Sequence, residues 1–256
     1  SQSSLPGVKK IIAVASGKGG VGKSTVATNI AVALSLLDEN ISVGLCDCDL
    51  YGPSIPLMFG QESARPTATD ENEIIPIESH GIKLMSMGFL LDDSSPVIVR
   101  GPLATRYTQQ FLTGCLWGDL DYLVLDLPPG TGDIQLTIAQ SVSVDGAVIV
   151  TTPQEMALID ARKAASMFAK VNVPILGIVE NMSYFLCPSD GEKYAIFGQG
   201  GGEKESARLG VPLIGQIPIE MQTREAGDSG NPIALGESET AKEFKNVAEK
   251  IIASLN

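Results

Sequence analysis

Residues 17–25 read Gly-Lys-Gly-Gly-Val-Gly-Lys-Ser-Thr, and this stretch decides the fold. It matches the pattern G-x-x-x-x-G-K-[ST] of a phosphate-binding P-loop. An apolar run at 11–15 precedes it, as a buried parallel strand would, and the apolar spacing at 26–37 predicts a helix after it. Because glycine lacks Cβ, backbone N–H groups of such a loop can turn inward around a phosphate, next to the positive end of the helix. The stretch therefore predicts a nucleotide-binding loop between a strand and a helix.

The residues of this loop have distinct predicted roles. Lys23 is expected to reach the β- and γ-phosphates, and the Ser24 hydroxyl is expected to bind Mg²⁺. Lys18 is an additional lysine that the ordinary pattern does not require. It resembles the deviant P-loop of the dimeric MinD/ParA/nitrogenase-iron-protein class, in which this lysine reaches the partner subunit's nucleotide; a solvated surface lysine is the alternative. The predicted nucleotide-binding residues of the loop are Gly17, Lys18, Gly19, Gly20, Val21, Gly22, Lys23, Ser24 and Thr25.

Carboxylates follow two further strand-like runs. The run at 121–126 ends in Asp126, which is the Walker B arrangement, in which the aspartate accepts from a Mg²⁺-bound water. The glycine- and proline-bearing turn at 127–133 is a candidate γ-phosphate switch. Asp47 and Asp49 are two residues apart, so in extended backbone they would point the same way. We predict that Asp49 orients the attacking water and that Asp47 supports Mg²⁺ or its waters; a solvated acidic loop is the alternative.

The base is predicted to be adenine, and the substrate ATP. Guanine-selective P-loop proteins of the Ras type carry Asn-Lys-x-Asp after a late strand, and this sequence lacks that motif. Asn181 instead follows the apolar run at 174–179, and its amide offers both a donor and an acceptor to the adenine edge. An asparagine that only stabilises a turn is the alternative.

Strand-like and helical patterns alternate along the 256 residues. Such alternation predicts an α/β fold, a doubly wound and mostly parallel sheet with helices on both faces, with nucleotide at the carboxyl ends of the strands. We expect an N-terminal tail at 1–8 and a single P-loop ATPase domain at 9–256, with loop-like stretches at 61–73 and 183–202. The expected strands are 11–15, 41–46, 97–99, 122–125, 147–151, 175–179 and 213–216, and the expected helices are 24–37, 103–117, 134–141, 156–170, 203–209 and 239–254.

Composition narrows the possible partners. The net charge of −12 disfavours binding to nucleic acid and to anionic lipid, so we expect neither a nucleic-acid nor a membrane partner. The apolar stretches are only strand-length, and residues 1–10 lack the apolar core of a signal peptide. Four cysteines without a disulfide-rich pattern agree with a reducing compartment. A cytoplasmic protein is therefore expected.

Taken together, the motifs resemble the Mrp/ApbC family of ATPases, which are relatives of the eukaryotic iron–sulfur scaffold ATPases. The resemblance runs over nearly the whole chain. It implies an ATP-hydrolysing homodimer that binds a [4Fe–4S] cluster and passes it to client apoproteins. Its marks are Leu-Pro-Gly-Val at 5–8, Cys-Asp-Cys-Asp-Leu-Tyr-Gly-Pro-Ser-Ile-Pro at 46–56, Arg-Gly-Pro at 100–102, Asp-Leu-Pro-Pro-Gly-Thr-Gly-Asp at 126–133, Thr-Pro-Gln at 152–154, Glu-Asn-Met-Ser-Tyr-Phe at 180–185, Ile-Pro-Ile at 217–219 and Arg-Glu-Ala-Gly-Asp at 224–228.

The chain departs from the family pattern at the expected cluster ligands. Many members carry Cys-x-x-Cys after the segment at 180–185, so that two subunits offer four thiolates to one bridging cluster. Here Cys187 is present, but Asp190 stands where the second cysteine would be. The remaining iron sites would need Asp190, a small thiol or the client protein, and an inert loop cysteine is the alternative. The other cysteines are expected to pack in the core: Cys46, Cys48 and Cys115.

Two other functions stay open. A positioning ATPase of the MinD or ParA kind would bind membrane or DNA when loaded with ATP. The C-terminal residues 239–256 do have apolar residues at helical spacing, but glutamates balance their lysines, which favours a solvated amphipathic core helix. A metal-free, ATP-dependent interaction switch of the same fold is the second alternative, and Asp190 is the reason to keep it.

Overall fold

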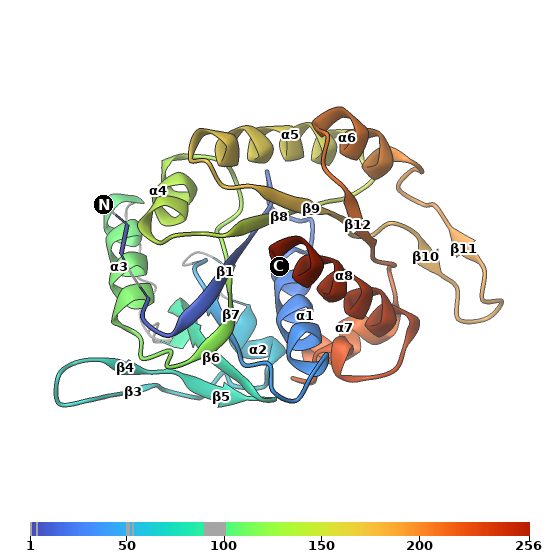
Figure 1. Cartoon of the computed structure of the whole chain (residues 1–256). Coiled ribbons are helices and arrows are strands. Elements are labelled where there is room, and N and C mark those ends of the chain that lie inside the picture. Colours follow the sequence, from blue (N-terminus) through green and yellow to red (C-terminus); the bar gives the residue numbers. More distant parts are fainter. Residues whose placement is uncertain (1, 4, 50–51, 53, 90–100) are drawn as a thin grey trace.

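A mostly parallel sheet with helices on both faces forms the centre of the protein, as predicted (Figure 1). The computed structural model describes residues 2–3, 5–49, 52, 54–89 and 101–256. Within these residues the main sheet has eight strands in the order β12-β9-β8-β1-β7-β2-β6-β5, and β5 is antiparallel to β6. The strands are β1 (Val8–Ala15), β2 (Val43–Asp47), β5 (Ile77–Ser79), β6 (Ile82–Ser86), β7 (Leu120–Asp126), β8 (Gly146–Thr151), β9 (Ile175–Glu180) and β12 (Leu213–Gln216).

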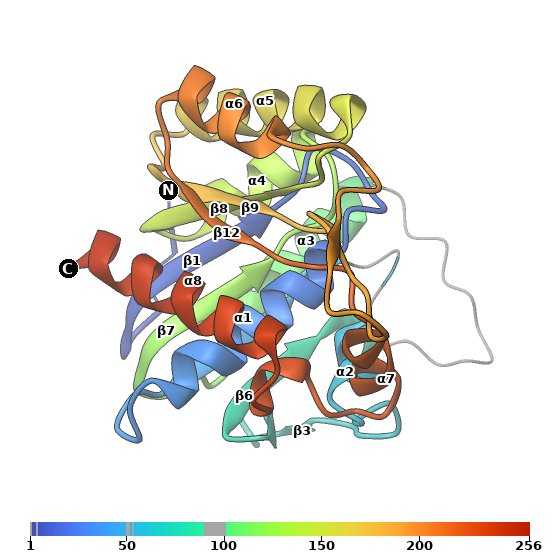
Figure 2. The same cartoon turned by 90° about the vertical axis from the view of Figure 1, so that its right-hand side faces the viewer.

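The helices form two layers around this sheet. In Figure 2, α5 and α6 lie above the sheet and α1 and α8 lie below it. The α-helices of the described residues are α1 (Lys23–Leu36), α2 (Ile55–Met58), α3 (Gly101–Gly114), α4 (Asp133–Ser141), α5 (Glu155–Lys170), α6 (Gly201–Leu209), α7 (Met221–Asp228) and α8 (Glu239–Leu255), and two short 3₁₀ helices span Met87–Phe89 and Ile233–Leu235.

The central strands are covered on both faces, and their sequences show it. Strands β1, β7 and β8 read as nearly continuous apolar runs, and side chains such as Ile12, Leu123 and Ile149 are fully buried. A parallel strand between two helical layers needs apolar residues at every position, whereas a half-exposed strand alternates. This is why these strands are easy to recognise from the sequence.

Helix α8 closes the lower layer. Its buried residues include Phe244, Val247 and Ile251, and the Ser238 hydroxyl caps its first turn by accepting from the backbone N–H of Ala241 at 3.1 Å. The helix packs against α1, as expected for an amphipathic core helix. No helix in the part of the chain that the structure describes combines the length and the apolar character needed to cross a bilayer.

Several short elements depart from the expectations. The patterns do not predict β5, β6, α2 or α7, because each is short and none has a long apolar period. The stretch expected to be a loop at 61–73 contains β3 (Thr67–Ala68), which pairs with β4 (Ile74–Ile75) directly after that stretch. The stretch expected to be a loop at 183–202 contains a hairpin of β10 (Phe185–Leu186) and β11 (Lys193–Tyr194). The strand expected at 97–99 lies outside the described residues.

Strand order brings the predicted site residues to one edge of the sheet. Strand β7 pairs in parallel with both β1 and β2, and Asp126 lies in register with Val14 on one side and Asp47 on the other. The P-loop leaves the carboxyl end of β1 at the same edge. Because parallel strands point the same way, three chain segments that are far apart in sequence converge there.

Candidate nucleotide site

The P-loop connects β1 to α1 through two glycines with left-handed backbone. Gly20 has φ 81° and Gly22 has φ 78°, a region that a residue with a Cβ occupies only with strain. The Ser16 hydroxyl donates to the Lys18 carbonyl at 2.7 Å, and the Ser16 carbonyl accepts from the Gly130 N–H at 2.9 Å. The first turn of α1 has no acidic side chain, so the positive end of the helix is left for an anion.

A cavity of about 230 Å³ opens above this loop. It brings Lys18, Lys23 and Asp49 together with the turn that contains Pro129, so residues from the carboxyl ends of three strands share one space. Its lining is Ser16, Lys18, Gly19, Gly20, Val21, Gly22, Lys23, Ser24, Thr25, Asp49, Ser54, Met58 and Pro129.

Lys23 and Ser24 both turn toward Asp126. The Lys23 ammonium forms an ion pair with Asp126 Oδ1, and the Ser24 hydroxyl donates to Asp126 Oδ2 at 2.7 Å. Burial raises the pKa of Asp126, and the charge of Lys23 opposes that rise. The predicted phosphate-binding lysine, the predicted magnesium-binding hydroxyl and the Walker B carboxylate therefore meet at one point.

Asp47 lies beside this pair and is shut off from water. Its carboxylate accepts from the Ser86 hydroxyl at 2.9 Å and from the Asp49 N–H at 3.1 Å. Burial, and then the neighbouring charge of Asp126, raise the pKa of Asp47 to about 8. Two carboxyl groups buried at one sheet edge repel each other when both are ionised, and a bound cation would relieve that repulsion. Oxygen donors of this kind are the ligands that Mg²⁺ prefers. The donor set of Ser24, Asp47 and Asp126 therefore fits a magnesium ion.

Asp49 has a different position from Asp47. Strand β2 ends at Asp47, so Asp49 lies beyond the extended backbone on which the predicted common direction of the two side chains depends. Asp49 lines the phosphate cavity and accepts from the Gly52 N–H at 3.2 Å, whereas Asp47 is not among the lining residues. Both aspartates are buried, which excludes a solvated acidic loop. Residues 50, 51 and 53 of this motif lie outside the described residues.

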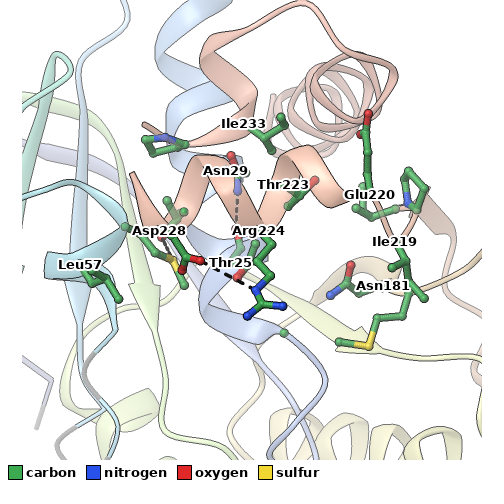
Figure 3. Close-up of a pocket in the computed structure, with 18 of the residues that line it drawn as sticks. Thr25, Asn29, Leu57, Asn181, Ile219, Glu220, Thr223, Arg224, Asp228 and Ile233 are labelled. Carbon is green, nitrogen blue, oxygen red and sulfur yellow. Dashed lines mark hydrogen bonds and ion pairs between the residues drawn. The ribbon is translucent and has the colours of Figure 1, made fainter. Parts of the chain in front are cut away.

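A larger cavity of about 490 Å³ adjoins the phosphate cavity (Figure 3). Gly22, Thr25 and Met58 line both cavities, so a ligand on the P-loop can extend from one into the other. The lining is mostly apolar. It comes from α1 and the glycine before it, α2, α7, the segments that follow β9, β11 and β12, and the start of the 3₁₀ helix at Ile233–Leu235: Gly22, Thr25, Thr28, Asn29, Leu57, Met58, Asn181, Met182, Phe197, Ile217, Pro218, Ile219, Glu220, Thr223, Arg224, Gly227, Asp228, Pro232 and Ile233.

Asn181 reaches the P-loop from the end of β9. Its Nδ2 donates to the Val21 carbonyl at 2.9 Å, and a Cβ on Gly22 would lie 2.3 Å from that nitrogen, which explains a glycine there. This bond uses one of the two N–H groups of Nδ2, so the other N–H and the side-chain oxygen are left for a base. The side chain lines the larger cavity, where it still has both a donor and an acceptor for a base.

Cys187 lies in the β10–β11 hairpin, which extends away from the sheet at the right of Figure 1. Its Sγ is partly exposed and lies 3.1 Å from the Ser189 hydroxyl. The Asp190 carboxylate accepts from the Glu192 N–H at 2.8 Å and from the Tyr194 hydroxyl at 2.7 Å, and these bonds lower the pKa of Asp190. The other cysteines are buried, as expected: Cys46, Cys48 and Cys115. The described residues contain no group of three or more His, Cys, Asp or Glu side chains that could hold a metal ion.

Comparison with known proteins agrees with this geometry. The family model of the NUBPL iron-transfer P-loop NTPases, of the ParA type, matches residues 7–252. This chain belongs to the NUBPL iron-transfer P-loop NTPases.

Relatives of this P-loop NTPase match it over almost its full length. The iron-sulfur cluster carrier protein of Aquifex aeolicus is 51% identical over 97% of the chain and 69% of its own length. The iron-sulfur cluster carrier protein of Escherichia coli strain K12 is 51% identical over 100% of the chain and 69% of its own length. Among solved structures, a nucleotide-binding protein of Archaeoglobus fulgidus in complex with ADP superposes with a TM-score of 0.80, at 40% identity over 93% of this chain and 92% of that one. The cell division ATPase MinD of Pyrococcus furiosus has a TM-score of 0.70 at 25% identity, over 95% of this chain and 98% of that one.

One part of the site in this NTPase is not predicted from the sequence. Helix α7 contributes Thr223, Arg224 and Asp228 to the larger cavity, and the segment before it contributes Ile219 and Glu220 (Figure 3). The run Arg-Glu-Ala-Gly-Asp at 224–228 marks the family resemblance, but its residue types alone do not indicate a role. Only the position of α7 beside the P-loop shows that it forms a wall of the cavity.

Proposed function

We propose that this protein is an ATP-hydrolysing homodimer that carries iron–sulfur clusters, assembling or transferring [4Fe–4S] clusters to apoproteins. The observation that carries the ATPase part is the convergence of Lys23, Ser24 and Asp126 at the carboxyl edge of the sheet, under a phosphate-sized cavity. The carrier part is supported by the two relatives named as iron-sulfur cluster carrier proteins, each of them 51% identical to this chain.

In the proposed reaction ATP binds with its phosphates on the P-loop. Lys23 leaves Asp126 and donates to the β- and γ-phosphates. Ser24 and Asp126, with Asp47 nearby, would hold a magnesium ion. Such an ion would neutralise charge on the phosphate oxygens. Asp49 accepts a proton of the attacking water and orients it toward the γ-phosphate. Lys18 of a second subunit supplies a further cation to the developing charge, which makes turnover depend on dimerisation.

The base is proposed to be adenine in the larger cavity. A nucleoside that extends from the P-loop past Gly22 and Thr25 enters a mostly apolar space of about 490 Å³, which is ample for a purine and its ribose. The side-chain oxygen of Asn181 can accept from the exocyclic amine of adenine, while its nitrogen remains bonded to the Val21 carbonyl.

The cluster is the cargo of the proposed carrier, and Cys187 is its proposed ligand. A dimer then offers two thiolates, and the other iron sites need Asp190, a small thiol or a client cysteine. Cargo that is held by few thiolates is easily given up, which suits a carrier. Asp190 also favours a second candidate, an ATP-dependent interaction switch that holds no metal. The cysteine side chains are all free thiols, which fits a reducing compartment such as the cytoplasm.

Anaerobic reconstitution with iron and sulfide tests the proposal. Iron and acid-labile sulfide are measured per dimer for the wild type, for Cys187→Ala and for Cys115→Ala, which removes a buried thiol as the matched control. We expect about four irons per dimer in the wild type and the control, and none in Cys187→Ala. Iron that persists in Cys187→Ala would place the cluster elsewhere. No iron in the wild type, with ATP hydrolysis intact, would support the metal-free switch.

A further inference from the structure

Arg224 is a highly exposed residue in the wall of the larger cavity. It lies in the middle of α7 and lines the cavity, yet its side chain is 88% exposed. Among the described residues its ion-pair partner is Asp228, one helical turn on, with 3.8 Å between Arg224 Nε and Asp228 Oδ2. Figure 3 shows the guanidinium extending away from α7 toward the side of the cavity where Thr25 and Asn181 lie.

The contacts of Arg224 leave its guanidinium plane available. An exposed ion pair at this distance holds a side chain only weakly. The lining of the larger cavity also includes apolar side chains, among them Met182, Ile219 and Phe197. Asp228, which pairs with the edge of this guanidinium, lines the same cavity. A planar aromatic ligand could cover the face of the guanidinium without displacing that pair.

The position of Arg224 separates it from the phosphates. The smaller cavity is lined by two lysines, Lys18 and Lys23, and Arg224 is not among its lining residues. Its charge therefore lies where it would contact the nucleoside part of a nucleotide and not the phosphates. Guanidinium is planar, delocalised and weakly hydrated, so it stacks on aromatic faces in a way that the compact ammonium of lysine does not.

We propose that the Arg224 guanidinium stacks on the face of the bound base and forms one wall of the base site, with the apolar side chains as the other wall. This inference rests on the proposed nucleotide function and adds a base-binding residue to it. Stacking is tolerant of base identity, so Arg224 contributes affinity for any nucleoside, and Asn181 is left to discriminate adenine.

The test compares two ligands on the full chain. Dissociation constants of Mg-ATP and of inorganic tripolyphosphate are measured by calorimetry for the wild type, Arg224→Lys and Arg224→Met. Arg65→Met, which removes another exposed arginine that bonds only backbone carbonyls of Glu62 and Ala64, is the matched control. We expect both Arg224 variants to bind ATP about 3- to 10-fold more weakly, with tripolyphosphate affinity changed less than about twofold.

Four results would overturn the proposal, and a fifth would refute the proposed ATPase. Full ATP affinity in Arg224→Lys would mean that charge alone matters, and full affinity in Arg224→Met would mean that the side chain does not contact the base. Equal losses for ATP and tripolyphosphate would place Arg224 on the phosphates. A wild type that binds tripolyphosphate as tightly as ATP would remove the base from this cavity, and a wild type that binds neither would instead refute the proposed ATPase. Because Arg224 is exposed, folding of the variants is checked simply by matching circular dichroism.

Discussion

The Lys23 ammonium is paired with the Asp126 carboxylate in a place that is nearly closed to water, with side-chain exposures of 5% and 0%. In a P-loop that holds a nucleotide, this lysine contacts phosphate. Here the strand-end carboxylate takes the place of the phosphate, and the Ser24 hydroxyl is bonded to the same carboxylate. On the proposed function, nucleotide and Asp126 therefore compete for Lys23. A magnesium ion beside Asp126 would replace the charge that Lys23 takes away, which would link nucleotide binding to magnesium.

We expect Lys23→Met to abolish nucleotide binding and to destabilise the free protein. The change leaves Asp126 buried without its cation, and breaking such a pair costs about 3 kcal/mol even when the carboxyl group can take up a proton. Calorimetry with Mg-ATP and urea unfolding without nucleotide measure the two effects. Lys23→Arg keeps the charge and serves as the control for stability. Undiminished ATP affinity in Lys23→Met would refute the role of Lys23.

Lys18→Ala is expected to behave in the opposite way. The Lys18 side chain lines the phosphate cavity, and no hydrogen bond or ion pair of its ammonium is found among the described residues. We therefore expect the free energy of unfolding to change by less than about 0.5 kcal/mol and ATP affinity to be kept. Turnover should fall by about 10³-fold, as when a charge in trans is removed from a phosphoryl-transfer site.

Steady-state ATP hydrolysis at several protein concentrations measures this effect. In the wild type, specific activity should rise with concentration as dimers form, and in Lys18→Ala it should stay low throughout. Lys10→Ala, a lysine in β1 away from the loop, is the control. Normal turnover in Lys18→Ala would leave Lys18 as a surface lysine without a catalytic role.

Asp47 should make the nucleotide-free protein less stable as pH rises. Its pKa is raised to about 8 in the folded protein, chiefly by burial, whereas an unfolded aspartate titrates near 4. The folded state therefore holds this proton more tightly than the unfolded state does. The stabilisation is complete below about pH 4 and is lost as pH rises toward 8. Urea unfolding without magnesium should show that the free energy of unfolding of the wild type falls between pH 5 and pH 8. In Asp47→Asn this fall should be smaller by on the order of 2 kcal/mol.

Asp121 serves as a control, because its effect on stability should depend on pH in the opposite direction. It accepts from the Ser42 N–H at 2.8 Å and from the Lys9 ammonium at 3.1 Å, and these contacts lower its pKa. The stabilisation that ionised Asp121 contributes is present above its pKa in the unfolded chain, and it is lost as pH falls through its pKa in the folded protein. Asp121→Asn should therefore lower the free energy of unfolding most near neutral pH. Equal pH profiles for Asp47→Asn and the wild type would show that Asp47 is ionised in the folded protein.

The sequence predicts those parts of the fold that are locally determined. A doubly buried parallel strand is apolar at every position, and the P-loop has a fixed glycine spacing, so β1, α1 and β7 can be recognised from their residues alone. Strand β6 is different. It has only five residues and Lys83 interrupts it, and it is held in the sheet by its pairing with β2. Such an element depends on contacts that are distant in sequence.

The same distinction holds at the site. Lys23, Ser24 and Asp126 are predicted because their chemistry is carried by motifs. Arg224 is not, because α7 has no buried residue and no apolar period, and its role depends only on where the chain returns to the P-loop. Asn181 shows an intermediate case: the sequence indicates the residue, but the bond from its Nδ2 to the Val21 carbonyl is seen only in the structure.

Asp190→Cys should convert the Cys187 hairpin into a stronger cluster site. The substitution gives each subunit two thiols separated by two residues, so that a dimer can offer four thiolates to one cluster. The Tyr194 hydroxyl and the Glu192 N–H lose their acceptor, but Asp190 is exposed, so water can replace it and the loss of stability should stay near 1 kcal/mol. We expect the reconstituted cluster to survive a chelator at least about tenfold longer than in the wild type. Asp190→Ser removes the carboxylate without adding a thiol, and it should not lengthen that lifetime. Equal lifetimes for Asp190→Cys and Asp190→Ser would show that the hairpin does not hold the cluster, and that position 190 matters only for the bonds that Asp190 makes within its own turn.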